Sequence, residues 1–251
     1  MFIGPLMALP IMLLSCAFFT KIFDSSPTDS PGIVIENHPR PDFTLNFSPF
    51  EDMGCPIDES GRRNCEQESQ LFSLGCDRIE KPSDLLGALE PAFPIAVCLF
   101  EPMNHPDQSE LMEGEYIYRK GGMLPVFVRY VIFQDSQFQL MKSEEQFRDV
   151  FAPIESEDEA LGYTLALRNL SAYYDLEFNP AYEYFVDKLE DTHVEGSPEG
   201  YLVHLFHYQF FGCGPHFTHA IVLRVTEQGM IEEISSEEVY KDPSEDGLCV
   251  D

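Results

Sequence analysis

Residues 201–240 read YLVHLFHYQFFGCGPHFTHAIVLRVTEQGMIEEISSEEVY, and this stretch decides the fold class of the chain. Three of its segments are rich in β-branched and aromatic residues, and glycine-containing turns separate them. Such segments are typical of antiparallel strands joined by short connections. The pattern predicts a meander with strands at Tyr201–Phe211, His216–Thr226 and Met230–Tyr240.

The same composition recurs in four shorter segments upstream, at Glu115–Arg119, Val126–Gln134, Gln137–Met141 and Tyr182–Leu189. Two short helices are expected between the third and the fourth. Ser143 with Gln146, and Ser156 with Glu159, have the spacing of a helix capping box, and each is followed by an apolar stripe. We therefore predict an α+β fold, an antiparallel meander sheet with a pair of short helices on one side.

The first twenty residues, MFIGPLMALPIMLLSCAFFT, carry no charge and are mostly apolar. Their length suits the apolar region of a signal peptide better than a membrane-spanning helix. We expect residues 1–15 to be a signal peptide. Because the first lysine is Lys21, the usual positive charge at the start is missing. A misassigned start codon and an uncleaved anchor both stay open.

The segment Leu13-Leu14-Ser15-Cys16 resembles the lipobox of bacterial lipoproteins. The resemblance implies that Cys16 becomes the first mature residue and carries the lipid. It also implies an outer-membrane or cell-surface location, since Ala17 rather than Asp follows the cysteine. Residues 16–50 are dense in Pro, Ser and Asp, which predicts a lipid-anchored linker.

The chain has seven cysteines, and removing Cys16 leaves 7 − 1 = 6. Six thiols in an exported chain predict three disulfides, with fifteen pairings open to sequence reasoning. Four of the six lie in residues 51–105, which show little strand pattern. We expect this region to be a loop-rich, disulfide-stapled subdomain with a short helix near Ser83–Leu89, preceding an α+β sheet domain at 106–251. The six cysteines are Cys55, Cys65, Cys76, Cys98, Cys213 and Cys249.

One pairing follows from the expected hairpin. If Thr226 pairs with Met230, His216 lies beside Tyr240, and Cys213 is just past that end of the sheet. The nine residues that follow Tyr240 are long enough to bring Cys249 back to it. We predict a disulfide between Cys213 and Cys249, with the other four cysteines paired among themselves.

Acidic residues dominate the charge: 44 Asp and Glu stand against 15 Lys and Arg, for a formal net charge of −29. Such a chain repels phosphate backbones, so we expect no nucleic-acid partner. The expected partners are the membrane, through the lipid, and an unidentified protein or small molecule.

Four histidines flank Cys213 in the sequence: His204, His207, His216 and His219. Their spacing along the chain is similar to that of the ligands in a metal site. Residues three apart on a strand face opposite sides of the sheet, which argues against a shared ion. Pairing Phe211 with His216 keeps co-facial histidines apart, whereas a slip of one residue places His207 opposite His219. We therefore expect no metal site and no cofactor, with these four histidines as the only metal candidates.

No catalytic or phosphate-binding motif stands out, so we assign no catalytic residue. We expect an envelope-anchored lipoprotein that acts as a non-enzymatic binding or scaffolding module. A secreted hydrolase and a periplasmic metal-handling protein are the alternatives. Three further motifs stand out: Phe211–His216 (FGCGPH), Ala152–Ser156 (APIES) and Asp246–Asp251 (DGLCVD). Through them the chain, from about Leu85 onward, resembles an uncharacterised family of bacterial secreted or lipoprotein-like proteins. The resemblance implies no activity.

Overall fold

The computed structural model describes residues 32–105 and 114–250. The expected signal peptide, Cys16, the linker up to residue 31 and residues 106–113 lie outside the described residues. In the described part of the chain, no helix has the length and apolar character needed to cross a membrane.

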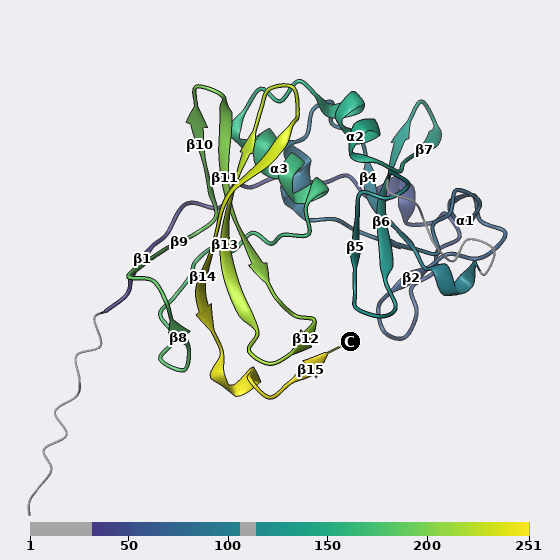
Figure 1. Cartoon of the computed structure of the whole chain (residues 1–251). Helices are drawn as coiled ribbons and strands as arrows, with labels where there is room; N and C mark the ends of the chain where they lie inside the picture. The colour runs from purple at the N-terminus through teal and green to yellow at the C-terminus, as the bar shows by residue number, and fades with distance from the viewer. Residues whose placement is uncertain (1–31, 106–113, 251) are drawn as a thin grey trace, which may run out of the picture. The chain divides into compact units, whose positions relative to one another are not determined.

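The strands form two main antiparallel sheets, where the sequence suggested one (Figure 1). The first has the order β2-β3-β4-β6-β5, with β7 paired to β6. The second has the order β10-β11-β13-β14-β8. The first sheet contains β2 (Arg63–Asn64), β3 (Arg78–Glu80), β4 (Ile95–Phe100), β5 (Tyr118–Lys120), β6 (Val126–Gln134) and β7 (Gln137–Met141). The second contains β8 (Glu183–Tyr184), β10 (His193–Ser197), β11 (Gly200–Tyr208), β13 (Phe217–Val225) and β14 (Ile231–Lys241).

Two small pairs of strands and a few short helices complete the described elements. Strand β1 (Val34–Glu36) pairs in parallel with β9 (Lys188–Glu190), and β12 (Gly212–Cys213) pairs with β15 (Cys249–Val250). The α-helices are α1 (Gln70–Ser73), α2 (Glu144–Phe151) and α3 (Glu157–Leu167). The 3-10 helices are η1 (Ser48–Phe50), η2 (Asp84–Ala88), η3 (Pro102–Asn104) and η5 (Pro243–Glu245). The predicted α+β class is confirmed.

Strand β4 lies in the region where we expected mostly loops. All six of its residues are buried, and alternate side chains enter two different cores. Ile95, Val97 and Leu99 face the larger core, whereas Ala96 and Cys98 face the smaller one. Because β4 pairs with β6, residues from 51–105 and from the later region share one sheet.

The larger core joins the two main sheets through α3. It contains Val128 of β6, Leu161 and Leu165 of α3, and Val203 and Leu205 of β11. Helix α3 packs closely against η2: a Cβ at Gly162 would lie 2.8 Å from the carbonyl oxygen of Leu85. Only glycine allows this approach.

The second half of the expected linker is packed onto the fold. Residues 34–36 form β1, and Leu45, Phe47 and Phe50 are buried. Burying these apolar side chains is favourable, so this part of the segment does not extend as a tether.

The β13–β14 hairpin begins in the expected register, since the amide of Thr226 donates to the carbonyl of Met230 at 3.0 Å. Two irregularities then shift the pairing, so that Tyr240 lies opposite Thr218 instead of beside His216. The expectation for Tyr240 was therefore wrong, because it assumed an unbroken ladder.

The predicted disulfide between Cys213 and Cys249 is nevertheless present, and the two cysteines are direct partners in the β12–β15 pair. The remaining disulfides join Cys55 to Cys65 and Cys76 to Cys98. Three disulfides indicate an oxidising, extracellular environment.

Candidate functional site

Two histidine side chains meet face to face on the second sheet. Strands β10 and β11 form a hairpin in which Ser197 pairs with Gly200, and this register sets His193 opposite His204. Their imidazole rings are stacked, with centroids 4.0 Å apart and an interplanar angle of 14°. The turn requires glycine at position 200, where φ is +123° and a Cβ would lie 2.1 Å from the carbonyl oxygen of Val225.

A third histidine extends this stack from a distant part of the sequence. His38 follows β1, and the β1–β9 pairing brings it to the second sheet. Its ring lies 4.1 Å from the ring of His193, with an interplanar angle of 18°. We call His38, His193 and His204 the histidine stack.

Two carboxylates face the ring nitrogens of the stack. Glu190 Oε2 lies 3.4 Å from His38 Nε2 and 3.8 Å from His193 Nε2. Glu195 Oε1 lies 3.6 Å from His193 Nε2. In two overlapping groups the potential ligand atoms all lie within 4.8 Å of one another: His38 with Glu190 and His193, and His193 with Glu195 and His204. The stack with Glu190 and Glu195 is the histidine–carboxylate cluster.

The backbone fixes which nitrogen of His193 carries the proton. Its Nδ1 lies 2.7 Å from the carbonyl oxygen of Asp191, which can only accept a hydrogen bond. In the neutral ring, Nδ1 therefore holds the proton and Nε2 presents a lone pair toward the carboxylates. A histidine held by its other nitrogen in this way is typical of metal ligands.

The carboxylate of Asp191 holds the surrounding segments in place. It is fully buried and accepts hydrogen bonds from Asn37 Nδ2 and from the amides of Asp175 and Leu176, at 2.8 to 3.1 Å. These bonds join the segment after β1, the 175–176 loop and the start of β10. Asp191 thereby positions His38 and His193 next to each other.

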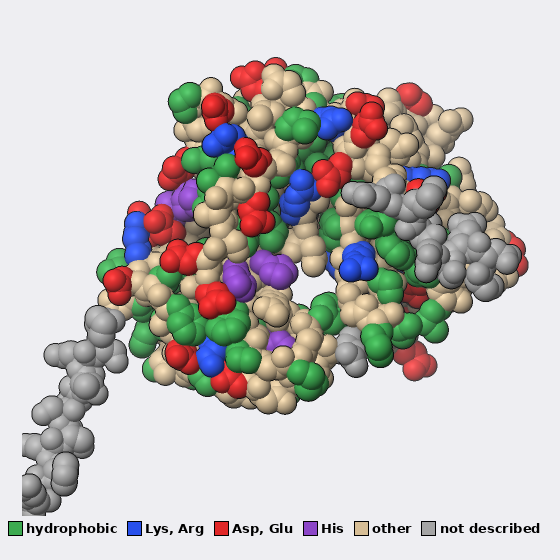
Figure 2. All heavy atoms as spheres, in the orientation of Figure 1, with side chains coloured by type: hydrophobic (Ala, Val, Ile, Leu, Met, Phe, Trp, Pro, Cys, Tyr) green, Lys and Arg blue, Asp and Glu red, His purple; other side chains and the backbone are tan. Residues whose placement is uncertain are grey.

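His204 has an unusual environment in the cluster. Its Nε2 atom is buried and has no hydrogen-bond partner among the described residues. Burial, followed by the repulsion of His193, lowers the pKa of His204 below its ordinary value, so the ring is neutral at pH 7. His193, His204 and Glu190 line a cavity of about 180 Å³ together with Lys188, Ser235 and Glu237. Histidine and acidic side chains lie close together on the surface near β1 and β9 (Figure 2).

Of the four histidines considered from sequence, only His204 belongs to this cluster. His207 lies opposite His219, as in the slipped register, with ring centroids 6.2 Å apart, so the alternative pairing of Phe211 with His216 is wrong. His216 is buried and donates from Nδ1 to the carbonyl of Gln209 at 2.8 Å, which gives it a structural role. Cys213 is held in its disulfide.

Sequence reasoning missed His38 and His193, but the position of His193 opposite His204 could have been predicted. Reading Pro198-Glu199 as a two-residue turn between Ser197 and Gly200 places His193 opposite His204. Nothing local to His38 indicates its neighbours, because the parallel pairing of β1 with β9 joins positions about 150 residues apart.

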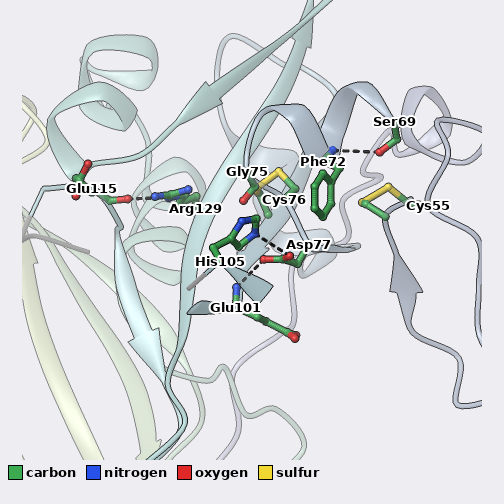
Figure 3. Close-up of a disulfide and its surroundings, with 12 residues drawn as sticks. Cys55, Ser69, Phe72, Gly75, Cys76, Asp77, Glu101, His105, Glu115 and Arg129 are labelled. Carbon is green, nitrogen blue, oxygen red and sulfur yellow. Dashed lines mark hydrogen bonds and ion pairs between the residues drawn. A yellow bond between two sulfur atoms is a disulfide. The ribbon is translucent and has the colours of Figure 1, made fainter. Parts of the chain in front are cut away.

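A second polar site lies in the first sheet, next to the disulfide of Cys76 and Cys98 (Figure 3). His105 Nε2 lies 2.9 Å from Asp77 Oδ1, and the buried Asp77 also accepts from the amide of Glu101 and from Asn104 Nδ2. The ring of His105 stacks on Phe100 at 4.6 Å.

His105 lines a cavity of about 510 Å³ together with Ser73 and the buried Arg129. Burial lowers the pKa of Arg129. A histidine whose imidazole is oriented by an aspartate has the arrangement of a general base, in which the imidazole takes up the proton. The Ser73 hydroxyl donates to the carbonyl of Ser69 at 3.1 Å, so the structure does not pair it with His105 as a nucleophile.

Comparison with protein-family models, with characterised proteins and with solved structures gives no match.

Proposed function

We propose that this protein is an envelope-anchored bacterial lipoprotein that acts as a non-enzymatic binding module on the oxidising side of the membrane. The cysteine pairing carries the proposal. Six of the seven cysteines are joined to one another, which leaves Cys16 as the one thiol outside these disulfides. That arrangement supports a lipid on Cys16, since a lipobox cysteine is modified and not oxidised to a disulfide.

The binding role is supported by the cavity on the second sheet. Charged and polar side chains from four strands converge there, among them Lys188, Glu190, His193 and Glu237. Side chains on paired strands hold a fixed geometry, which favours recognition of a ligand over simple solvation. The partners of the module are the membrane, through the lipid, and a ligand at this sheet face.

The anchor is tested by replacing Cys16 and labelling growing bacteria with a fatty-acid analogue. We expect the label and membrane association in the unaltered protein, and the loss of both in Cys16→Ser. The double variant Cys213→Ser/Cys249→Ser keeps Cys16 and serves as the matched cysteine control, because it should keep the label. A labelled Cys16→Ser protein, or an unlabelled parent, would contradict the anchor.

The pair of His105 and Asp77 favours a second candidate function, a secreted hydrolase. In that case His105 would act as a general base toward water, with Asp77 orienting its ring. Hydrolysis of a chromogenic ester that is lost in His105→Gln and kept in His207→Gln would support the enzyme. Equal background rates in all three proteins would favour the binding module.

A further inference from the structure

We propose that His193, His204 and Glu195 bind one Zn²⁺ ion, because one potential ligand atom from each of them lies within 4.8 Å of the other two. Imidazole nitrogens with a carboxylate oxygen form a ligand set that Zn²⁺ prefers, whereas Ca²⁺ and Mg²⁺ prefer oxygen alone. This inference names the ligand of the proposed binding module and rests on it for its biological setting.

The distances leave room for an ion between the ligand atoms. Zinc lies about 2.0 to 2.2 Å from nitrogen and oxygen ligands, so two ligands of a tetrahedral ion are roughly 3.3 to 3.6 Å apart. His193 Nε2 lies 3.6 Å from Glu195 Oε1 and 3.8 Å from Glu190 Oε2. The ligand atoms of His193, Glu195 and His204 all lie within 4.8 Å of one another, so side-chain rotations are needed to bring all three to coordination distance.

The hydrogen bonding of the two histidines also fits a ligand role. Because the Nδ1–H of His193 donates a hydrogen bond to the carbonyl of Asp191, the lone pair on Nε2 points at carboxylate oxygens, which cannot donate to it. The buried Nε2 of His204 has no partner among the described residues. A cation between His193, Glu195 and His204 gives the imidazole of His204 a partner and neutralises the carboxylate of Glu195.

His38 is a positioning residue in this arrangement. It stacks on the face of His193 and hydrogen-bonds to Glu190 at 3.4 Å. The three stacked rings stand in a row, so a single ion reaches the ring nitrogens of neighbouring rings only. His193 is central to the row. We assign the ion to the side of His204, because His38 already has Glu190 as a partner.

The rings of His193 and His204 are nearly parallel, at 14°. A shared ion must lie close to the plane of each imidazole, so the two rings must tilt toward each other on binding. Replacing the ion by Co²⁺ gives a direct readout of this geometry, since a tetrahedral site with nitrogen ligands absorbs visible light much more strongly than hydrated Co²⁺.

The test is calorimetric titration of the purified, oxidised protein with ZnCl₂ after treatment with a chelator. We expect one Zn²⁺ per chain, and an affinity at least tenfold weaker in His193→Ala and in His204→Ala. His207→Ala lies on the same strand as His204 but outside the cluster, so it should bind like the parent. Glu195→Gln keeps the shape of the side chain and should weaken binding without unfolding the protein.

Three results would overturn the proposal. The first is the absence of stoichiometric Zn²⁺ binding, and the second is an unchanged Zn²⁺ affinity in His193→Ala. The third is a loss of Zn²⁺ affinity in His207→Ala equal to the losses in His193→Ala and His204→Ala. A loss in His38→Ala with none in His204→Ala would overturn the ligand set. Circular dichroism of each variant separates loss of the ion from loss of the fold. Because the titration needs no membrane, its outcome is independent of the labelling test for the Cys16 anchor.

Discussion

At the scale of single residues, Asp191 is the carboxylate on which the histidine–carboxylate cluster depends most. It is fully buried and receives three hydrogen bonds from other segments of the chain. A buried carboxylate in this setting is stabilised by its donors. When it is removed, the donors are left without partners in a place that water does not reach.

Replacing Asp191 by alanine should therefore lower the free energy of unfolding by roughly 2 to 4 kcal/mol. Urea unfolding with the disulfides intact measures this loss. Asp187 is exposed and close by in sequence, so Asp187→Ala is the matched control and should change stability by less than about 0.5 kcal/mol. Equal effects of the two variants would show that the buried hydrogen bonds contribute little.

His207 offers a prediction about pH. Burial, followed by the repulsion of His219 opposite it, lowers the pKa of His207, and Glu233 opposes the shift only in part. Its NMR titration midpoint should lie below the usual value of about 6.5, and His219→Asn should raise it. The unfolded chain then binds more protons than the folded one as the pH falls through 6.5, so stability decreases on acidification. A midpoint above 6.5 would contradict the burial argument.

At the scale of elements, the disulfide between Cys213 and Cys249 holds together two strands of two residues each, β12 and β15. Two backbone pairs are too few to keep such strands together alone. Both cysteines are exposed, so replacing them removes the cross-link with little change in packing.

The double variant Cys213→Ser/Cys249→Ser should lose about 3 to 4 kcal/mol of stability by the loop-closure relation, given a sequence separation of 36. Urea unfolding measures the loss, and hydrogen exchange locates it. We expect amides near β12 and β15 to lose protection while those of β4 and β6 keep it under native conditions. Unchanged exchange at Gly214, whose amide donates to the carbonyl of Leu248, would show that the strands pair without the bond.

The elements that sequence predicts well are those with local signals. Strands β6 and β7 have the predicted bounds, since the turn at Asp135-Ser136 separates two clear segments. Helices α2 and α3 begin at the predicted caps, where Ser143 and Ser156 accept from the amides of Gln146 and Glu159.

The elements that were missed lack such signals. Strand β4 is buried on both faces, so it shows no alternation of polar and apolar residues. The bulges between β13 and β14 and the stacking of His38 on His193 depend on contacts between distant segments. For the same reason the sequence indicated only His204 of the histidine–carboxylate cluster.

At the scale of the whole molecule, the excess of acidic residues sets the long-range electrostatics. Strand β14 shows the pattern locally, because Glu232, Glu233, Glu237 and Glu238 are all exposed. A formal net charge of −29 concentrated in a compact fold repels itself more strongly than in the expanded, unfolded chain.

Raising the salt concentration should therefore stabilise the fold. The Debye length falls from about 30 Å in 10 mM salt to about 3 Å in 1 M, so repulsion across the molecule is screened. Screening also weakens attractive pairs such as Lys188 with Glu36, but exposed ion pairs contribute at most about 1 kcal/mol each. With 44 acidic against 15 basic side chains, the repulsive pairs outnumber the attractive ones, and the loss of repulsion is the larger effect.

The measurement is urea unfolding at pH 7 in 10 mM and 500 mM NaCl, with tetramethylammonium chloride in place of NaCl as a control for specific sodium binding. Equal stabilisation by both salts is the expected result. A decrease in stability with salt would mean that the ion pairs outweigh the net charge, and stabilisation by sodium alone would point to a bound cation.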